Sequence, residues 1–114
     1  MKYPRCRMMR PHKFNARRCT VNGIKFPSKL EGRVYARLLA DQDAGRIRDL
    51  KLQVVYVLQV SPKITYRIDF SYIDCVTDEL VLIEAKGKET DVFRLKLKLF
   101  QARYPDLDLR VVKS

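Results

Sequence analysis

Apolar and polar residues follow two different periods along the chain. Between Ile64 and Tyr72 every second residue is apolar, which is typical of a β-strand that turns one face toward a core. Further along, apolar residues recur every three or four positions, as on one face of a helix, at Phe93, Leu97, Phe100 and Tyr104. The sequence therefore predicts both strands and helices within one short chain.

Turn and cap residues mark the boundaries of several segments. The Asn-Gly pair at 22–23 lies between two short apolar–polar runs and favours the type I′ turn of a β-hairpin. Ser28 and Glu31 have the spacing of a capping box, which marks the start of a helix. They predict a helix over residues 29–43, and Gly45 supplies the left-handed residue that ends it.

The complete order of predicted elements is a hairpin, a helix, three strands, a helix and a strand. Their ranges are 19–26, 29–43, 46–60, 64–72, 80–87, 90–104 and 107–112. This order predicts an α/β fold with a mixed central β-sheet flanked by helices. A length of 114 residues fits a single domain of this kind.

Charge is distributed unevenly along the chain. The sequence has 24 lysines and arginines against 13 acidic residues, a net charge of +11. Nine of the cations and none of the acids fall within residues 1–30. We therefore predict a basic N-terminal arm over residues 1–17, followed by the folded domain over residues 18–114. Such an arm favours contact with nucleic acid, and a solvated tail that only aids solubility is the alternative.

Composition also argues against several classes of protein. Apolar residues make up 46% of the chain, so we expect a packed core and not a disordered chain. The sequence contains no run of about 18 apolar residues, so we expect no contact with the membrane interior. The basic N-terminus lacks the apolar stretch of a secretory signal, and Cys6, Cys19 and Cys75 are widely spaced. We therefore expect reduced thiols and a cytoplasmic protein.

A charged residue stands in the middle of the apolar stripe of the first predicted helix. Glu31 projects between Tyr35 and Leu38 when the residues are spaced around a helix axis. A carboxylate that points toward a core needs a partner, because burying it alone costs several kcal/mol. Glu31 is also a member of the capping box, so the helix pattern leaves a capping role and a site role equally open.

Opposite charges at the end of the strand predicted over 80–87 indicate a second candidate position. Glu84 and Lys86 are two residues apart, so their side chains share one face of that strand. Asp69 lies on the polar face of the preceding strand and can approach Glu84 if the two strands pair. An ion pair between Glu84 and Lys86 with no chemical role is the alternative interpretation.

Carboxylates that converge in a sheet repel each other unless a cation lies between them. A hard divalent cation such as Mg²⁺ suits a site made only of oxygen ligands. The Lys86 ammonium suits an anionic substrate or an attacking water, and the basic arm suits a polyanion. Asp69, Glu84 and Lys86 together therefore indicate metal-assisted chemistry on a phosphodiester.

Asp69, followed after 14 intervening residues by Glu84-Ala85-Lys86, resembles the signature of the PD-(D/E)XK nuclease superfamily. Other parts of the chain resemble a family of small phage and prophage proteins placed in that superfamily, over residues 12–18, 22–31, 44–47, 50–53, 66–70 and 86–100. The blocks occur in this order, and the resemblance covers roughly residues 12–112.

The resemblance implies a restriction-endonuclease-like domain with a defined set of site residues. Asp69 and Glu84 would hold Mg²⁺ or Mn²⁺, with Glu31 and the Ala85 carbonyl as further ligands. Lys86 would orient or activate the attacking water and offset charge on the phosphorane, so that Glu31, Asp69, Glu84 and Lys86 form the catalytic set. Gln53 matches an accessory glutamine on the second strand of many such sites.

The implied function is a divalent-metal-dependent endodeoxyribonuclease, with branched DNA such as Holliday junctions as a substrate of DNA recombination. The protein would act as a homodimer, in the host cytoplasm if it is encoded by a phage. We expect cations along the chain to contact DNA, namely Lys2, Arg5, Arg7, Arg10, Lys13, Arg17, Arg18, Lys88 and Lys96. The alternative function is that of a non-catalytic basic nucleic-acid-binding protein.

Overall fold

The chain folds in the predicted order of elements, with one additional short strand near the N-terminus. The computed structural model describes residues 7–8 and 19–113. Its elements are β1 (Arg7–Met8), β2 (Cys19–Val21), β3 (Ile24–Phe26), α1 (Lys29–Asp43), β4 (Ile47–Gln59), β5 (Ile64–Asp74), β6 (Leu80–Ala85), α2 (Asp91–Arg103) and β7 (Asp108–Val112). The predicted helices and longer strands agree with these bounds to within two residues at each end. β1 lies in the predicted arm, where the sequence shows no periodicity.

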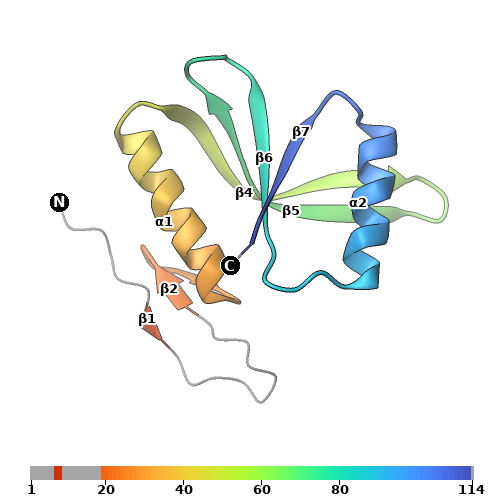
Figure 1. Ribbon diagram of the computed structural model, residues 1–114, viewed down its shortest axis with the longest axis horizontal. Helices are drawn as coiled ribbons and strands as arrows, with labels where there is room; N and C mark the ends of the chain where they lie inside the picture. The colour runs from red at the N-terminus through yellow and green to blue at the C-terminus, as the bar shows by residue number, and fades with distance from the viewer. Residues whose placement is uncertain (1–6, 9–18, 114) are drawn as a thin grey trace.

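The strands form two sheets. β1, β2 and β3 make a small antiparallel sheet, and β4, β5, β6 and β7 make a four-stranded sheet in that order. β6 and β7 run parallel, whereas the other neighbours in the larger sheet are antiparallel. The larger sheet is therefore mixed, as predicted, and Figure 1 shows α1 and α2 on either side of it. The described residues form one α/β domain.

The local turn and cap signals are confirmed. Asn22 and Gly23 have φ angles of 52° and 80°, which are the positive values that a type I′ hairpin turn requires. The Ser28 side chain caps α1 and accepts a hydrogen bond of 3.1 Å from the Glu31 N–H. Gly45, with a φ of 78°, follows the end of the same helix.

The hydrophobic core consists of two clusters, each associated with one helix. Buried members of the cluster against α1 include Phe26, Tyr35, Leu38, Phe70, Val81 and Ile83. Buried members of the cluster against α2 include Leu58, Tyr66, Ile68, Leu82, Phe93 and Phe100. Successive residues of β6 alternate between the two clusters, which confirms that the helices cover opposite faces of this strand.

The apolar residues of β5 before Asp69 pack in one hydrophobic cluster, and those after Asp69 pack in the other. The sequence pattern assigns the apolar residues of this strand to a single face, and these residues do lie inside the protein. However, Tyr66 and Ile68 pack in the cluster against α2, whereas Phe70 and Tyr72 pack in the cluster against α1. Asp69 therefore lies at the junction of the two clusters and belongs to neither.

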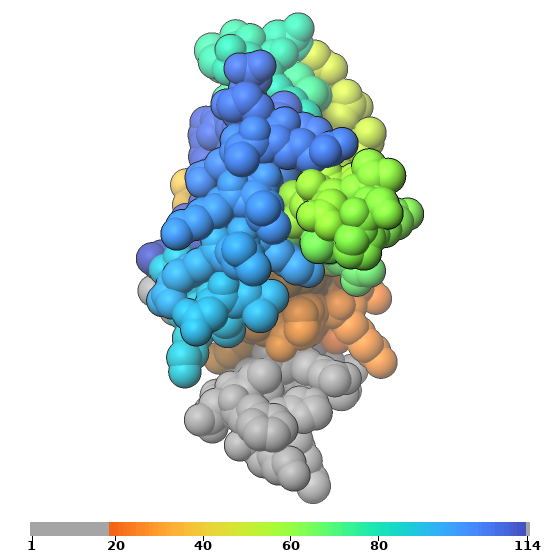
Figure 2. Space-filling view, turned by 90° about the vertical axis from the view of Figure 1, so that its right-hand side faces the viewer, coloured from red at the N-terminus to blue at the C-terminus, as the bar shows by residue number. Residues whose placement is uncertain are grey.

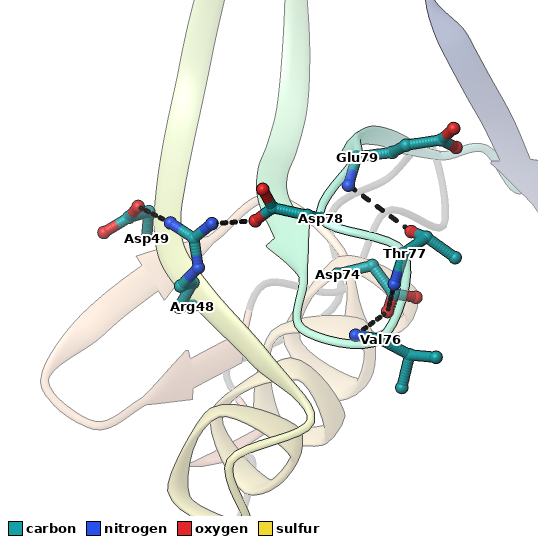
Figure 3. A network of polar contacts seen from close by, with 7 residues as sticks. All are labelled: Arg48, Asp49, Asp74, Val76, Thr77, Asp78 and Glu79. Carbon is teal, nitrogen blue, oxygen red and sulfur yellow. Dashed lines mark hydrogen bonds and ion pairs between the residues drawn. The ribbon is translucent and has the colours of Figure 1, made fainter.

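The turn between β5 and β6 is held by polar contacts, which Figure 3 shows from close by. The Asp74 carboxylate accepts hydrogen bonds from the Val76 N–H at 2.8 Å and from the Thr77 N–H at 3.3 Å. Arg48 on β4 forms ion pairs with Asp78 of the turn and with its own neighbour Asp49. These contacts hold the turn in shape and connect it to β4.

Close packing of α1 on the small sheet places the first turn of this helix. Gly32 is buried in α1, directly after Glu31. A Cβ atom at position 32 would overlap the Sγ atom of Cys19 on β2, so only glycine permits this approach.

Three observations bear on the expectations for the cysteines and for the membrane. Cys19 is disulfide-bonded, so the expectation that all three cysteines are reduced is wrong at this residue. Cys75 is a free and exposed thiol. Neither helix of the described residues is long and apolar enough to cross a bilayer.

Candidate active site

A cleft of about 590 Å³ opens where the two hydrophobic clusters meet. Three carboxylates line it, from Glu31 on α1, Asp69 on β5 and Glu84 on β6. Four cations line the same cleft, from Lys25, Arg67, Lys86 and Lys96. The structure therefore brings together all four residues that the sequence nominates as catalytic, in an acidic site surrounded by positive charge.

Asp69 and Glu84 are cross-strand neighbours. The register pairs Phe70 with Ile83, so the next position along both strands places Asp69 opposite Glu84. One oxygen of Asp69, Oδ2, accepts a hydrogen bond of 2.9 Å from the N–H of Ala85. This bond fixes the orientation of the Asp69 carboxylate at the end of β6.

Glu84 is buried against like charge. Its side chain is only 3% exposed and lies beside Asp69. Burial and the neighbouring Asp69 carboxyl raise the pKa of Glu84 from 4.5 to about 8, and the Lys86 ammonium acts in the opposite direction without compensating. At neutral pH the Glu84 carboxyl group is therefore mostly protonated and uncharged.

Glu31 belongs to the site as well as to the helix cap. Its backbone N–H is capped by Ser28, whereas its side chain is 6% exposed and interacts with Asp69. Burial and the Asp69 carboxylate raise the pKa of Glu31 from 4.5 to about 7. The backbone of Glu31 thus takes part in the helix cap, whereas its carboxyl group lies in the cleft.

Lys86 lies beyond the last residue of β6, which ends two residues earlier than predicted. Its Nζ atom lies 5.0 Å from the ring centroid of Phe93 on α2, a cation–π distance. Among the ion pairs of the described residues there is none between Lys86 and Glu84, so the structure does not support the purely structural alternative. Lys86 instead acts on Glu84 and Glu31 at longer range, where it opposes in part the rise in the pKa of both.

Gln53 lies next to the acidic cluster on the opposite strand. The pairing of β4 with β5 places Gln53 level with Asp69, and the Gln53 side chain lines the cleft. Its φ angle of 56° is unusual within a strand, although β4 continues through this position. The predicted accessory position is thus close to the carboxylates.

Sequence reasoning did not identify three further residues that line the cleft. Lys25 follows the hairpin turn, Arg67 is an exposed neighbour of Asp69, and Tyr66 agrees with the apolar period of its strand. The Tyr66 hydroxyl oxygen is buried and makes no hydrogen bond of ordinary geometry. Burial and the nearby Glu84 carboxyl raise the pKa of Tyr66, so the phenol stays protonated and can donate a hydrogen bond into the site.

The predicted DNA-contacting cations divide into three groups. Lys96 lines the cleft, and Lys88 is exposed in the segment between β6 and α2. Arg7 belongs to β1, and its side chain is not described. The other predicted contacts lie outside the described residues, namely Lys2, Arg5, Arg10, Lys13, Arg17 and Arg18.

The donor set of the site fits a hard divalent cation chemically. Within residues 7–8 and 19–113, no three metal-ligating side chains are positioned to hold an ion together. Burial, and after it the neighbouring Asp69 carboxyl, raise the pKa values of Glu31 and Glu84, and the Lys86 ammonium opposes this only in part. A divalent cation would supply further positive charge, and Asp69, Glu84 and Glu31 offer only oxygen donors.

Comparisons with known proteins give a family but no activity. No curated protein and no solved structure shows significant similarity to the chain. One family model, described as "Protein of unknown function (DUF1064)", matches residues 11–114 and thus covers the whole α/β domain. The chain therefore belongs to the DUF1064 family.

Proposed function

We propose that this protein is a divalent-metal-dependent endodeoxyribonuclease, which uses Mg²⁺ or Mn²⁺ to hydrolyse phosphodiester bonds in DNA. The observation that carries the proposal is the convergence of Glu31, Asp69 and Glu84 beside Lys86 in a cleft lined by cations. Such a site combines oxygen donors for a cation with positive charge for a phosphate. The resemblance to the PD-(D/E)XK superfamily supports the same activity.

Each residue would have a distinct role in this reaction. Asp69 and Glu84 would hold the cation, with Glu31 and the Ala85 carbonyl as additional donors. The cation, when bound, supplies Lewis-acid stabilisation of the charge on the phosphoryl oxygens. Lys86, held over the Phe93 ring, would orient the attacking water and stabilise the same developing charge. Lys25, Arg67 and Lys96 would hold the DNA backbone across the cleft.

Branched DNA, including four-way junctions of the kind formed in recombination, is the substrate that we propose. A chain of 114 residues offers a small footprint for such a substrate, so we propose that two copies act as a homodimer. The DNA substrate places the proposed reaction in the cytoplasm, which is the host cytoplasm for a phage-encoded chain.

Cleavage by the purified full chain on a substrate panel tests this function. The panel contains linear, nicked, flapped and four-way DNA, each incubated with Mg²⁺, with Mn²⁺ and with a chelator. We expect metal-dependent cleavage that Glu84→Gln abolishes. The matched control is Glu89→Gln, because the Glu89 carboxylate lies outside the cleft and pairs with Lys113 at 2.7 Å.

The opposite result would favour a different function. Binding of every DNA in the panel without cleavage under either metal would identify a non-catalytic basic nucleic-acid-binding protein. The net charge of +11 agrees with that function, but it does not account for three buried carboxylates in one cleft.

A further inference from the structure

Helix α2 carries a second apolar stripe, on its outer side. Val92, Leu95 and Leu99 are 63%, 58% and 37% exposed, although all three are large apolar residues. Their spacing of three and four residues continues to the exposed Ala102. These positions form one continuous row on a helix, which we call the outer stripe.

The outer stripe lies opposite the face of α2 that packs in the core. At about 100° per residue, Leu95 and Leu99 lie roughly 200° and 240° around the axis from the buried Phe93. Figure 2 views this side of the molecule and shows α2 at the surface, with no other described segment over it. A helix with apolar rows on both sides is typical of one that is buried on both sides.

Cations border the outer stripe on both sides. On the same helical projection Arg94 and Lys98 fall along one border, and Lys96 and Arg103 fall along the other. The only acidic residue of α2 is Asp91 at its N-terminal end, and it pairs with Arg94 at 3.1 Å. An apolar row between two rows of positive charge is complementary to an apolar row between two rows of negative charge.

We propose that the outer stripe of α2 binds an acidic amphipathic helix of a partner protein, with leucine-like residues against Leu95 and Leu99 and carboxylates against the bordering cations. Helix-in-groove recognition uses this combination of apolar anchors at three- and four-residue spacing. Charge complementarity at the borders gives orientation and faster association. Val92 and Lys96 also line the cleft, so the two sites adjoin at the N-terminal end of α2. The partner proposal does not depend on the proposed nuclease function.

Charge makes the other occupants less suitable. A second copy would bring four bordering cations against four more, in a chain whose net charge is already +11. Nucleic acid would neutralise the cations, but its phosphates would leave the exposed leucine side chains in water. An acidic amphipathic helix satisfies both the apolar row and its borders.

The test uses a synthetic helical peptide that carries leucines at i, i+3, i+4 and i+7 with glutamates on both sides. Binding to the full chain is measured by fluorescence anisotropy, beside a scrambled peptide and a peptide with lysines in place of the glutamates. We expect only the acidic amphipathic peptide to bind. Leu95→Ser with Leu99→Ser should weaken it at least about tenfold, because losing one buried leucine contact corresponds to about that factor.

Control variants separate this site from general effects. Val76→Ser removes an apolar side chain that is 90% exposed outside α2, and it should leave the peptide affinity unchanged. Lys98→Glu should weaken binding and reduce its dependence on salt. All variants should keep the wild-type melting temperature and, because Leu95 and Leu99 do not line the cleft, the wild-type cleavage rate.

Three results would each overturn the proposal. Equal binding of the scrambled peptide would show that the surface lacks helix specificity. A wild-type dimer that the two serine substitutions dissociate would assign the stripe to a second copy. Loss of DNA affinity in the same double variant, with no effect on the peptide, would assign the surface to nucleic acid.

Discussion

Replacing Glu84 by glutamine should stabilise the metal-free protein at pH 8. The folded protein raises the pKa of Glu84 from 4.5 to about 8, mainly through burial and through Asp69. Below pH 4.5 the carboxyl group is protonated in both the folded and the unfolded chain. In that range Glu84 therefore does not lower the free energy of unfolding. As the pH rises from 4.5 toward 8, unfolding releases a proton, so the free energy of unfolding falls.

The structure gives the size of this effect. The full rise in the pKa of Glu84, from 4.5 to about 8, corresponds to about 5 kcal/mol. Glu31 titrates in the same cluster as Glu84, so we assign less than half of it, about 2 kcal/mol, to this side chain alone. In a domain of this length that is a rise in Tm of roughly 8 °C.

Thermal melts of the wild type and of Glu84→Gln between pH 4.5 and pH 9 measure this effect in a chelator. We expect the two melting temperatures to separate progressively above pH 4.5, where the unfolded carboxyl group titrates. Mg²⁺ at pH 8 should raise the melting temperature of the wild type and have little effect on the variant. Glu89→Gln is the matched control, because the Lys113 ammonium lowers the pKa of Glu89. Loss of the Glu89 carboxylate should therefore not raise the melting temperature.

One result would refute the reasoning. If Glu84→Gln melts at or below the wild type at pH 8 in a chelator, the carboxylates do not destabilise one another. The assignment of this cluster as a cation site would then lose its physical basis.

Three further predictions concern other parts of the molecule. Lys86→Ala should slow single-turnover cleavage by about 10²–10³ while the protein stays folded, and Lys86→Arg should not restore the full rate; a destabilised variant that cuts normally would reject this role. Deletion of residues 1–11 should weaken DNA binding, because the segment carries four cations that can contact phosphates. The slope of log K against log[salt] should change by about 3 to 4, and an unchanged slope would exclude such contacts. Gly32→Ala should lower the free energy of unfolding by about 1–3 kcal/mol through overlap with Cys19, whereas Gly87→Ala, which meets open space, should change it little in urea titrations.

Local signals in the sequence were sufficient to predict the elements. The Asn-Gly pair at 22–23 has the backbone angles that its chemistry favours, and Ser28 caps the helix that it was expected to begin. Each of these signals depends on residues within one turn of the chain. Tertiary packing did not override them.

The arrangement of the core depends on contacts that are distant in the sequence. A period of two assigns the apolar residues of β5 to one face, but it does not show that this face meets two separate clusters. The division at Asp69 arises because α1 and α2, which are far apart in the chain, each cover a different part of the strand. No window of local sequence contains that information.

The site residues could be predicted mainly from charged side chains at positions where the strand or helix pattern expects apolar ones. Glu84 was identified because an acidic residue ends an otherwise apolar strand, and Asp69 because it lies on the polar face of the preceding strand, within reach of Glu84. The structure places both in the cleft. Tyr66 was missed because a tyrosine agrees with the apolar period of its strand. The contact of Lys86 with the Phe93 ring could not be predicted either, since it depends on where α2 returns to the sheet.

The position of the carboxylates at the junction of the two clusters has an evolutionary consequence. Because neither cluster needs a side chain of Glu31, Asp69 or Glu84 to complete its packing, neutral substitutes at these positions would leave the core intact. Mutation under selection for folding alone would therefore replace them, and the more stable neutral variants would accumulate. In the metal-free protein, the buried Glu31 and Glu84 therefore cost stability at neutral pH that neutral side chains would not cost. Relatives with the same fold can thus differ in activity, and the residues at this junction are the ones to compare.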